Sequence, residues 1–444
     1  MTVTDHQNTA QSETSQIVAT REDAPQPNRT PPQAATFAGY HPHAPGYTRL
    51  MGALCCGGIA TFTQLYSPQA LLPQLSQGLG VSEGDAGLVV SMGTIGLALG
   101  VFPWAWMADR VGRVPAMRYA SMIGAVAAVL GAFSPTLHIL LISRLVTGFT
   151  VGAVPVLALS YLNSQMSPAF AARAAGVFVA GNSVGGLLGR LVAGTSGAQW
   201  GWSAGLLLAA LFGAAFSFAF ALLIPSERGA AKVAGSGAES PNPSKVGPSQ
   251  SARARKQRNP FVANLTNSTQ IRIFAVGFLL MGVFVPIYNF LGFRLQHAFG
   301  VPERYTAMLF FGVLSGVFTA LWAAALVERM SRSFVVAGSA AVMVVGLAAT
   351  LIPHLWAQVA GLLLVSIGFF GGHSVASGWA SVGNPATRTQ AGALYTLAYY
   401  GGGSLVGWLG GHIFGGWGWT ALMGMLAICA TTCALLAVSL RGPR

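Results

Sequence analysis

Three ionisable side chains interrupt long apolar stretches of this sequence: Arg144, Arg190 and His373. A charge at membrane depth is costly, so each is a functional candidate by default. The two guanidinium groups, expected at a similar depth in neighbouring helices, could hold an anion, and a histidine titrates near physiological pH and could carry a coupling proton. The structural alternatives are an arginine bonded to backbone carbonyls and a neutral histidine that bridges helices.

No carboxylate accompanies these residues at membrane depth. All 11 Asp and Glu residues fall in tails, loops or the ends of apolar stretches. Exporters of cationic compounds usually need a buried acid to pair the cation, so we expect neutral or anionic organic substrates. Proton coupling would then use His373, Asp85 at the end of its span, or Asp109 in a loop.

Polar and aromatic side chains on the same stretches are candidates to line a cavity. Amphipathic aromatic residues with few charges suit semi-polar organic ligands, although ordinary packing is the alternative for each. The candidates are Gln64, Tyr66, Gln69, Tyr288, Asn289, Tyr395, Tyr399 and Tyr400.

The elements that must position these residues are membrane-spanning helices. The 444 residues are 53% hydrophobic and only 8% charged, against about 25% charged in soluble domains. A span needs about 20 apolar residues. The predicted spans are 50–72, 86–107, 114–134, 137–160, 170–195, 202–224, 271–293, 305–327, 334–352, 356–379, 389–413 and 418–440.

The spans divide into two groups of six. We expect a disordered cytoplasmic tail over 1–48, a six-helix bundle over 49–224, a cytoplasmic linker over 225–270 and a second bundle over 271–444. Basic residues favour the cytoplasmic side, which places both termini inside and only Arg294 and Arg304 in outer loops. This distribution accounts for the net charge of +13 without nucleic acid.

An internal repeat relates the two groups. Asp109-Arg110-Val111-Gly112-Arg113 recurs in weaker form as Glu328-Arg329-Met330-Ser331-Arg332, 219 positions later. Trp200-Gly201-Trp202 and Trp417-Gly418-Trp419 open the sixth and twelfth spans at nearly the same offset. Two homologous membrane halves are typical of secondary transporters.

Glycines four residues apart mark one face of spans 2, 5, 8 and 11, and such faces let helices approach closely in lipid. They are Gly96 and Gly100, Gly181, Gly185 and Gly189, Gly312 and Gly316, and Gly403, Gly407 and Gly411.

These features resemble the major facilitator superfamily. Residues 105–114 match its loop signature G-x-L-A-D-R-x-G-R-[RK] except at Ala105, Met107 and Val114, and Arg144 with Gly148 matches R-x-x-x-G in span four. The stretches 181–190, which adds Asn182 as a candidate, and 371–379 resemble twelve-span bacterial efflux permeases of the arabinose-efflux-like branch. No proline lies in 181–190, unlike the G-P-x-x-G-G motif of drug/proton antiporters.

The resemblance implies an all-α fold of two pseudo-symmetric six-helix bundles whose spans 2, 5, 8 and 11 form the interface on which the halves rock. It also implies that Asp109 docks near Thr387 when the site faces outward, because a helix N-terminus stabilises a carboxylate. The remaining residues of this expected latch are Arg110, Gly112 and Arg113, with Glu328 and Arg332 as a weaker mirror.

We therefore expect a proton-coupled exporter of small neutral or anionic organic compounds, monomeric, in a bacterial inner membrane. The alternatives are an importer or facilitator of a small organic anion and a membrane sensor that moves nothing. An enzyme is not expected, because the sequence shows no nucleophile-base pair, metal cluster or P-loop lysine, and no cofactor is expected. The substrate itself cannot be derived from the sequence.

Overall fold

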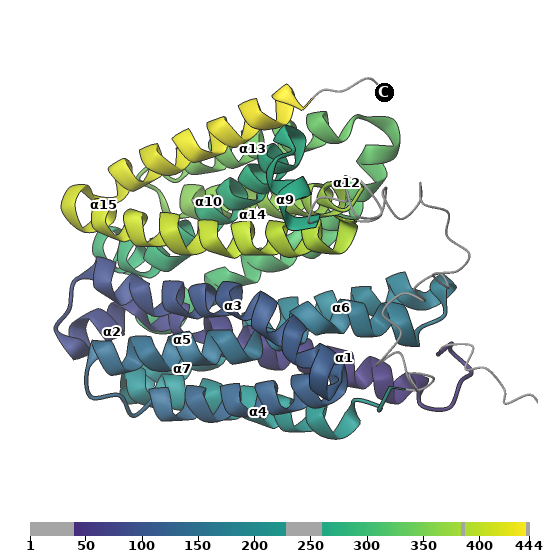
Figure 1. The fold of residues 1–444 in the computed structure, drawn as a ribbon. Helices are drawn as coiled ribbons and strands as arrows, with labels where there is room; N and C mark the ends of the chain where they lie inside the picture. Colours follow the sequence, from purple (N-terminus) through teal and green to yellow (C-terminus); the bar gives the residue numbers. More distant parts are fainter. Residues whose placement is uncertain (1–39, 228–259, 383–386, 441–444) are drawn as a thin grey trace, which may run out of the picture. The chain divides into compact units, whose positions relative to one another are not determined.

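The computed structural model describes residues 40–227, 260–382 and 387–440, which are helical for most of their length (Figure 1). The first half forms α1 (Tyr47–Tyr66), η1 (Ser67–Leu71), α2 (Leu72–Leu79), α3 (Glu83–Val111), α4 (Arg113–Gly131), α5 (Leu137–Val151), α6 (Ala153–Gln165) and α7 (Pro168–Leu223). The second half forms α9 (Pro260–Leu265), α10 (Ser268–Phe299), α11 (Glu303–Thr306), η2 (Ala307–Leu314), α12 (Ser315–Arg329), α13 (Arg332–Ala349), α14 (Leu355–Ala380) and α15 (Arg388–Ser439).

Two of these helices reverse direction at a glycine, and the two positions are related by the internal repeat. Gly201 in α7 has φ 84° and Gly418 in α15 has φ 76°, values that only glycine adopts without strain. Figure 1 shows α15 as two legs that meet at this reversal. The paired Trp-Gly-Trp motifs thus mark the turns that join spans five to six and eleven to twelve.

Nine helices in the described ranges are long and apolar enough to cross a membrane. Because α7 and α15 each supply two legs, these nine account for every predicted span except the first, which is α1. Large apolar side chains stay exposed on the helices, among them Trp322 at 74% and Phe318 at 69%. In water such exposure would be unfavourable, and in a bilayer these side chains face lipid.

Residues 40–46, expected in the disordered tail, are described and lie against the first bundle. Tyr40 is fully buried, its N–H donates to the Gln165 carbonyl at 2.8 Å, and its own carbonyl accepts from Ser167 at 3.2 Å. The remainder of the tail, residues 1–39, and most of the linker, residues 228–259, lie outside the described residues.

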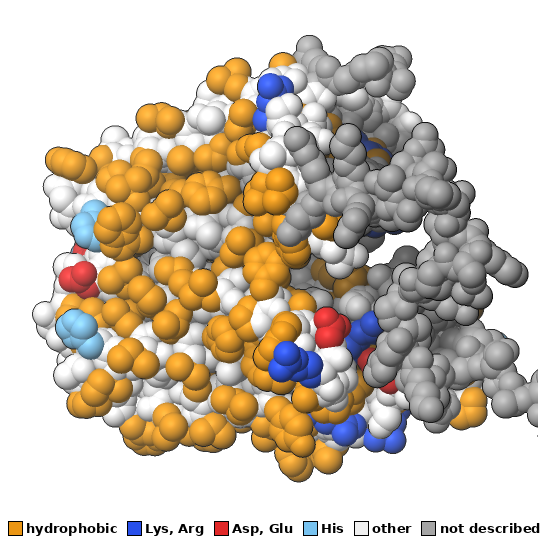
Figure 2. All heavy atoms as spheres, viewed as in Figure 1, with side chains coloured by type: hydrophobic (Ala, Val, Ile, Leu, Met, Phe, Trp, Pro, Cys, Tyr) orange, Lys and Arg blue, Asp and Glu red, His pale blue; other side chains and the backbone are white. Residues whose placement is uncertain are grey.

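The two ends of the bundles differ in charge. We call the end with Arg113, Arg329 and Arg388 the basic end, and the end with the turns at Gly201 and Gly418 the opposite end. Figure 2 shows arginine side chains toward the centre and right of the visible face, histidine side chains at its left edge, and apolar side chains over much of the face.

Spans 2 and 11 meet across the halves, but most predicted glycine faces do not lie there. Gly96 packs on the backbone of Leu145 in its own half, and Gly185 packs on Ile59. Gly316 likewise lies against Phe370 of its own half. These faces therefore serve packing inside each bundle, and that part of the interface prediction was wrong.

The exception is the part of α15 just before its turn at Gly418, where Gly411 lies. A Cβ at Gly84 of α3 would lie 2.9 Å from the carbonyl carbon of Gly411. The two backbones are therefore in direct contact here, which only glycine permits.

Candidate functional site

Arg190 is a buried cation on α7 at the boundary between the halves. Its side chain is 4% exposed. Its Nε–H donates to Gln69 Oε1 at 2.8 Å, and its Nη1 donates to the Gly186 carbonyl at 2.6 Å. Its Nη2 makes no hydrogen bond to a described residue. No carboxylate of the described chain forms an ion pair with it.

Gln69 connects Arg190 by hydrogen bonds to the second half of the protein. Its Nε2 donates to Asn289 Oδ1 on α10 at 2.6 Å, and both side chains are almost fully buried. A guanidinium can only donate, so Gln69 must present its oxygen to Arg190 and its nitrogen to Asn289. Each residue in the series Arg190, Gln69, Asn289 therefore donates to the next. Asn289 Nδ2 remains without a partner in the described chain.

Aromatic rings enclose the guanidinium and continue away from it into the second half. Arg190 Cζ lies 4.7 Å from the Tyr66 ring centroid and 4.9 Å from that of Phe310. Successive ring centroids are no more than 5.8 Å apart along the wall. In order, this aromatic wall is Phe310, Tyr288, Phe284, Phe369, His373, Tyr399 and Tyr400.

The far part of the wall returns toward the first half. The Tyr400 carbonyl accepts from the Ser404 hydroxyl, which lies 2.6 Å from that of Thr94 on α3. Rings of both halves, Tyr66 and Phe310, thus contact Arg190, and the wall runs from there to His373.

His373 is half-buried inside this wall. Its Nδ1 shares a hydrogen bond with the Tyr395 hydroxyl at 3.0 Å, and its ring lies 4.3 Å from that of Tyr399. Its other ring nitrogen makes no hydrogen bond to a described residue.

Arg144 is placed differently from Arg190, although the sequence suggested a pair. It is 2% exposed, and all three of its nitrogens donate to backbone carbonyls, of Gln64 and Leu65 at 2.7 Å and of Val89 at 3.4 Å. In a regular helix the Gln64 carbonyl would accept from residue 68, but Pro68 has no N–H. Arg144 therefore satisfies carbonyls left open where α1 gives way to η1.

The other candidate residues mostly make helix-to-helix contacts. Gln64 donates to Ser217 Oγ at 2.9 Å, and Tyr288 shares a hydrogen bond of 2.7 Å with Ser366. Asn182 packs against Gly58 of α1, and its Oδ1 is buried without a partner in the described residues. Of the substrate candidates, the structure brings together Tyr66, Gln69, Tyr288, Asn289, Arg190, His373 and Tyr399, and leaves Arg144 and Asn182 apart.

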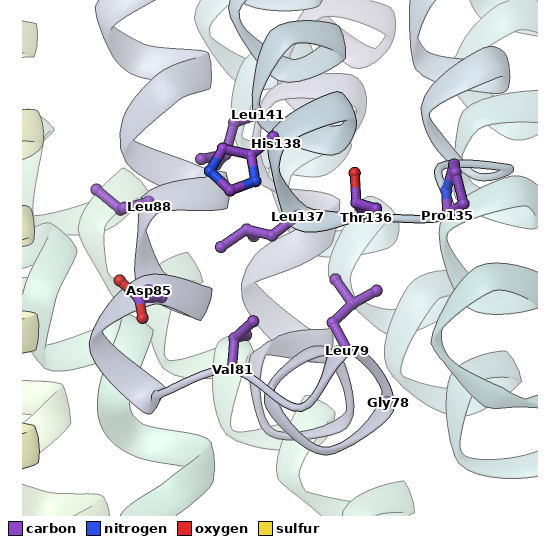
Figure 3. Close-up of a pocket in the computed structure, with 10 residues that line it drawn as sticks. All are labelled: Gly78, Leu79, Val81, Asp85, Leu88, Pro135, Thr136, Leu137, His138 and Leu141. Carbon is purple, nitrogen blue, oxygen red and sulfur yellow. The ribbon is translucent and has the colours of Figure 1, made fainter.

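Asp85, a possible proton-coupling acid, lies in a separate cavity of about 540 Å³ at the opposite end (Figure 3). The walls come from the turn after α2, the start of α3 and the start of α5, and His138 is among them. The Asp85 carboxylate accepts from the Ser82 hydroxyl at 2.7 Å, as part of the N-terminal cap of α3. The cavity shares no lining residue with the Arg190 region.

Further contacts close the opposite end between the halves, and no sequence pattern predicts them. Gln74 donates to Glu303 at 2.8 Å, and Glu83 lies 3.7 Å from His297. Deeper in the interface, the hydroxyls of Thr94 and Ser404 are 2.6 Å apart. These partners are far apart in sequence and have no spacing that would pair them.

The expected latch at the basic end is not engaged in this conformation. Asp109 is exposed and has no hydrogen bond or ion pair within the described ranges, and neither has Glu328. Arg113 donates to Ser164 at 2.8 Å and lies 3.9 Å from Glu227, while Arg110 stacks on Trp106. Gly112, at φ 91°, makes the turn between α3 and α4, and Arg332 begins α13. Docking of Asp109 near Thr387 stays a prediction for the other conformation.

The sequence matches known transporters over most of its length. The profile of the Major Facilitator Superfamily matches residues 54–407. The inner membrane transport protein YnfM of Escherichia coli is 31% identical over 89% of this chain and 91% of its own length. The uncharacterized MFS-type transporter YybF of Bacillus subtilis is 26% identical over 86% of this chain and 91% of its own.

Solved structures share the fold at low sequence identity. The nucleoside transporter NupG is 16% identical with a TM-score of 0.65, over 88% of this chain and 98% of that one. A bacterial homologue of the lysosomal transporter Spinster, in an inward-facing and occupied conformation, is 16% identical with a TM-score of 0.67, over 89% and 95%. The fold is that of two six-helix bundles, as expected. The chain belongs to the major facilitator superfamily and is a multi-pass membrane transporter rather than an enzyme.

Proposed function

We propose that this protein is a secondary transporter of a small organic anion that carries one negative charge and an aromatic or similarly flat apolar body. The single observation that carries the proposal is Arg190, a buried guanidinium without a carboxylate partner in the described chain and with one nitrogen open beside aromatic rings.

A buried charge without a counter-ion is unfavourable by several kcal/mol, even after the surroundings relax. Gln69 and Gly186 supply neutral acceptors, which offset only part of this cost. A substrate anion would supply the missing charge at the open nitrogen. Because Arg144 is occupied by backbone carbonyls, Arg190 offers one cation, and a second negative charge on the substrate would go unpaired.

The aromatic wall supports a flat apolar body. Its rings form a nearly continuous surface from Phe310, next to Arg190, to Tyr399. Pockets that are mostly apolar, with a few polar groups in fixed positions, are typical of small-molecule sites.

His373 is the proposed proton-binding group, because one of its ring nitrogens makes no hydrogen bond within the described chain and its ring belongs to the same aromatic wall as Phe310. A proton on His373 adds positive charge, so it favours binding of the anion rather than competing with it. Proton and anion are then expected to move in the same direction, which corresponds to uptake driven by a proton gradient. Export remains the second candidate, because 181–190 and 371–379 resemble efflux permeases.

We place the basic end in the cytoplasm, as the positive-inside bias indicates. The relative from the Escherichia coli inner membrane supports a bacterial inner-membrane location. In this orientation the conformation described here is closed toward the outside.

The test uses purified protein in liposomes with three probes of matched size: benzoate, benzamide and benzylammonium. We expect labelled benzoate to accumulate above protein-free liposomes when the outside is acidic, and the other two to enter at background rates. An acidic interior that drives benzoate inward would instead favour exchange and export. Equal uptake of all three probes into the liposomes would refute an anion site.

A further inference from the structure

The planar guanidinium of Arg190 has one edge that is only half occupied. Nε and Nη2 present parallel N–H groups, which is the geometry that a carboxylate binds with both oxygens. In this structure the Nε–H is bonded to the neutral oxygen of Gln69, and Nη2 has no partner in the described chain. A carboxylate that takes the whole edge must displace Gln69 Oε1.

That same Gln69 joins the two halves. Its Nε2 bonds to Asn289 Oδ1 at 2.6 Å and lies 3.4 Å from the Val285 carbonyl, both in the second half. Gln69 is 3% exposed and Asn289 is fully buried. The bond between them therefore exists only while the opposite end is closed, and its orientation is fixed by Arg190.

We propose that substrate binding releases this inter-half bond. The substrate carboxylate takes the Nε and Nη2 edge of Arg190, displaces Gln69 and so favours opening of the opposite end. The inference rests on the proposed function, because the displacing group is the anion of that proposal. It adds that Gln69 and Asn289 are positioning residues that couple occupancy to conformation.

The direction of the effect follows from the cost of an unsatisfied acceptor. While the opposite end stays closed, a displaced Gln69 oxygen is buried without a donor. This cost shifts the equilibrium between the closed and the open end toward the open one by about 5- to 150-fold. Opening admits water to that oxygen and removes the cost. A ligand moves a conformational equilibrium only by its differential affinity for the two states, and this displacement supplies such a difference.

The geometry also separates anions from neutral analogues. A single carbonyl, as in benzamide, can accept from the open Nη2 and leave Gln69 in place. Such a ligand occupies the region without breaking the bond to Asn289, so it should bind without opening the end.

The test measures the distance across the opposite end with spin labels at Gln77→Cys and Ala298→Cys. Both positions are exposed, in the last turns of α2 and α10. The native cysteines are replaced first, Cys55, Cys56 and Cys429 by serine and the buried Cys433 by alanine. We expect benzoate to raise the long-distance population about 5- to 150-fold, and benzamide to leave it unchanged.

Two variants separate this mechanism from a general loosening of the interface. Gln69→Leu removes the displaced acceptor, so the long-distance population should rise about 2- to 12-fold without ligand and benzoate should add nothing. Gln74→Leu is the control, because it removes the hydrogen bond to Glu303 at the same end without contact to Arg190. It should open the end to a similar degree and keep the full response to benzoate.

The outcomes distinguish the two proposals. Benzoate that binds the wild-type chain, measured by calorimetry, but leaves the distances unchanged would overturn the inference alone. So would a benzoate response that persists in Gln69→Leu. Absence of benzoate binding would overturn the proposed substrate class, and with it the displacement step. Where a variant fails to fold, the distances measured on the wild-type protein with benzoate and with benzamide still test the displacement of Gln69.

Discussion

Replacement of Arg190 by methionine should abolish anion binding while the fold is retained. Methionine keeps most of the length and the apolar contacts with Tyr66 and Phe310, and removes the charge. Loss of one partner of a buried charge pair costs about 2–5 kcal/mol of binding, which corresponds to a fall in benzoate affinity of at least about 30-fold. Stability should change little, because the loss of an uncompensated buried cation offsets the loss of the hydrogen-bond donor to Gln69 Oε1.

The matched comparison is Arg144→Met. That change removes the Arg144 donors to the Gln64 and Leu65 carbonyls near Pro68, at about 1–3 kcal/mol for each carbonyl left buried without another donor, and the weaker bond to Val89 on α3. We expect a marked loss of thermal stability and of folded yield. Benzoate uptake into liposomes and the midpoint of thermal unfolding, measured on both variants, check the contrast. Benzoate uptake at the wild-type rate by Arg190→Met would contradict a binding role for Arg190. Equal destabilisation of the two variants would contradict the different roles of the two arginines.

Three further predictions follow from the remaining contacts. His373→Phe keeps a ring in the aromatic wall and removes the titrating group, so benzoate exchange at equal pH should continue while uptake driven by an acidic exterior is lost; retained accumulation would exclude His373 as the proton-binding group. Gly84→Val places a side chain against the Gly411 backbone, so labels across the opposite end should report mainly the open state, and an unchanged distance would contradict the contact. Asp109→Asn should slow uptake severalfold without weakening benzoate binding to the conformation described here, in which Asp109 has no partner in the described chain; weakened binding there would contradict a role confined to the other state.

Much of the architecture could be predicted because it depends on local features of the sequence. The length of apolar stretches fixes the spans, and the glycine of each Trp-Gly-Trp motif fixes a reversal by its positive φ. The repeat relates the halves because each must bury a similar set of helix faces. The first span is weaker by composition, since α1 carries polar residues that the site uses.

The contents of the site were less predictable, because they depend on which residues meet across the bundles. Arg144 and Arg190 look alike in sequence, yet one bonds to carbonyls near a proline 76 positions away and the other has an open nitrogen. Pro68 was the available signal for a carbonyl in need of a donor. The glycine faces misled the prediction because close packing within a bundle and between bundles requires the same residue.

The phenylalanines of the wall were missed for a related reason. Phe284, Phe310 and Phe369 have no feature in sequence that separates them from lipid-facing aromatic residues. Their role becomes visible only when Tyr288 and His373 are seen to pack between them.

The anion site at Arg190 can be tested by calorimetric titration of the purified wild-type protein with benzoate and with benzylammonium at neutral pH, followed by the same titrations of Arg190→Met. We expect saturable binding of benzoate alone, and loss of that binding in the variant. Binding of benzylammonium by the wild-type protein, or unchanged benzoate affinity in Arg190→Met, would contradict an anion site at Arg190.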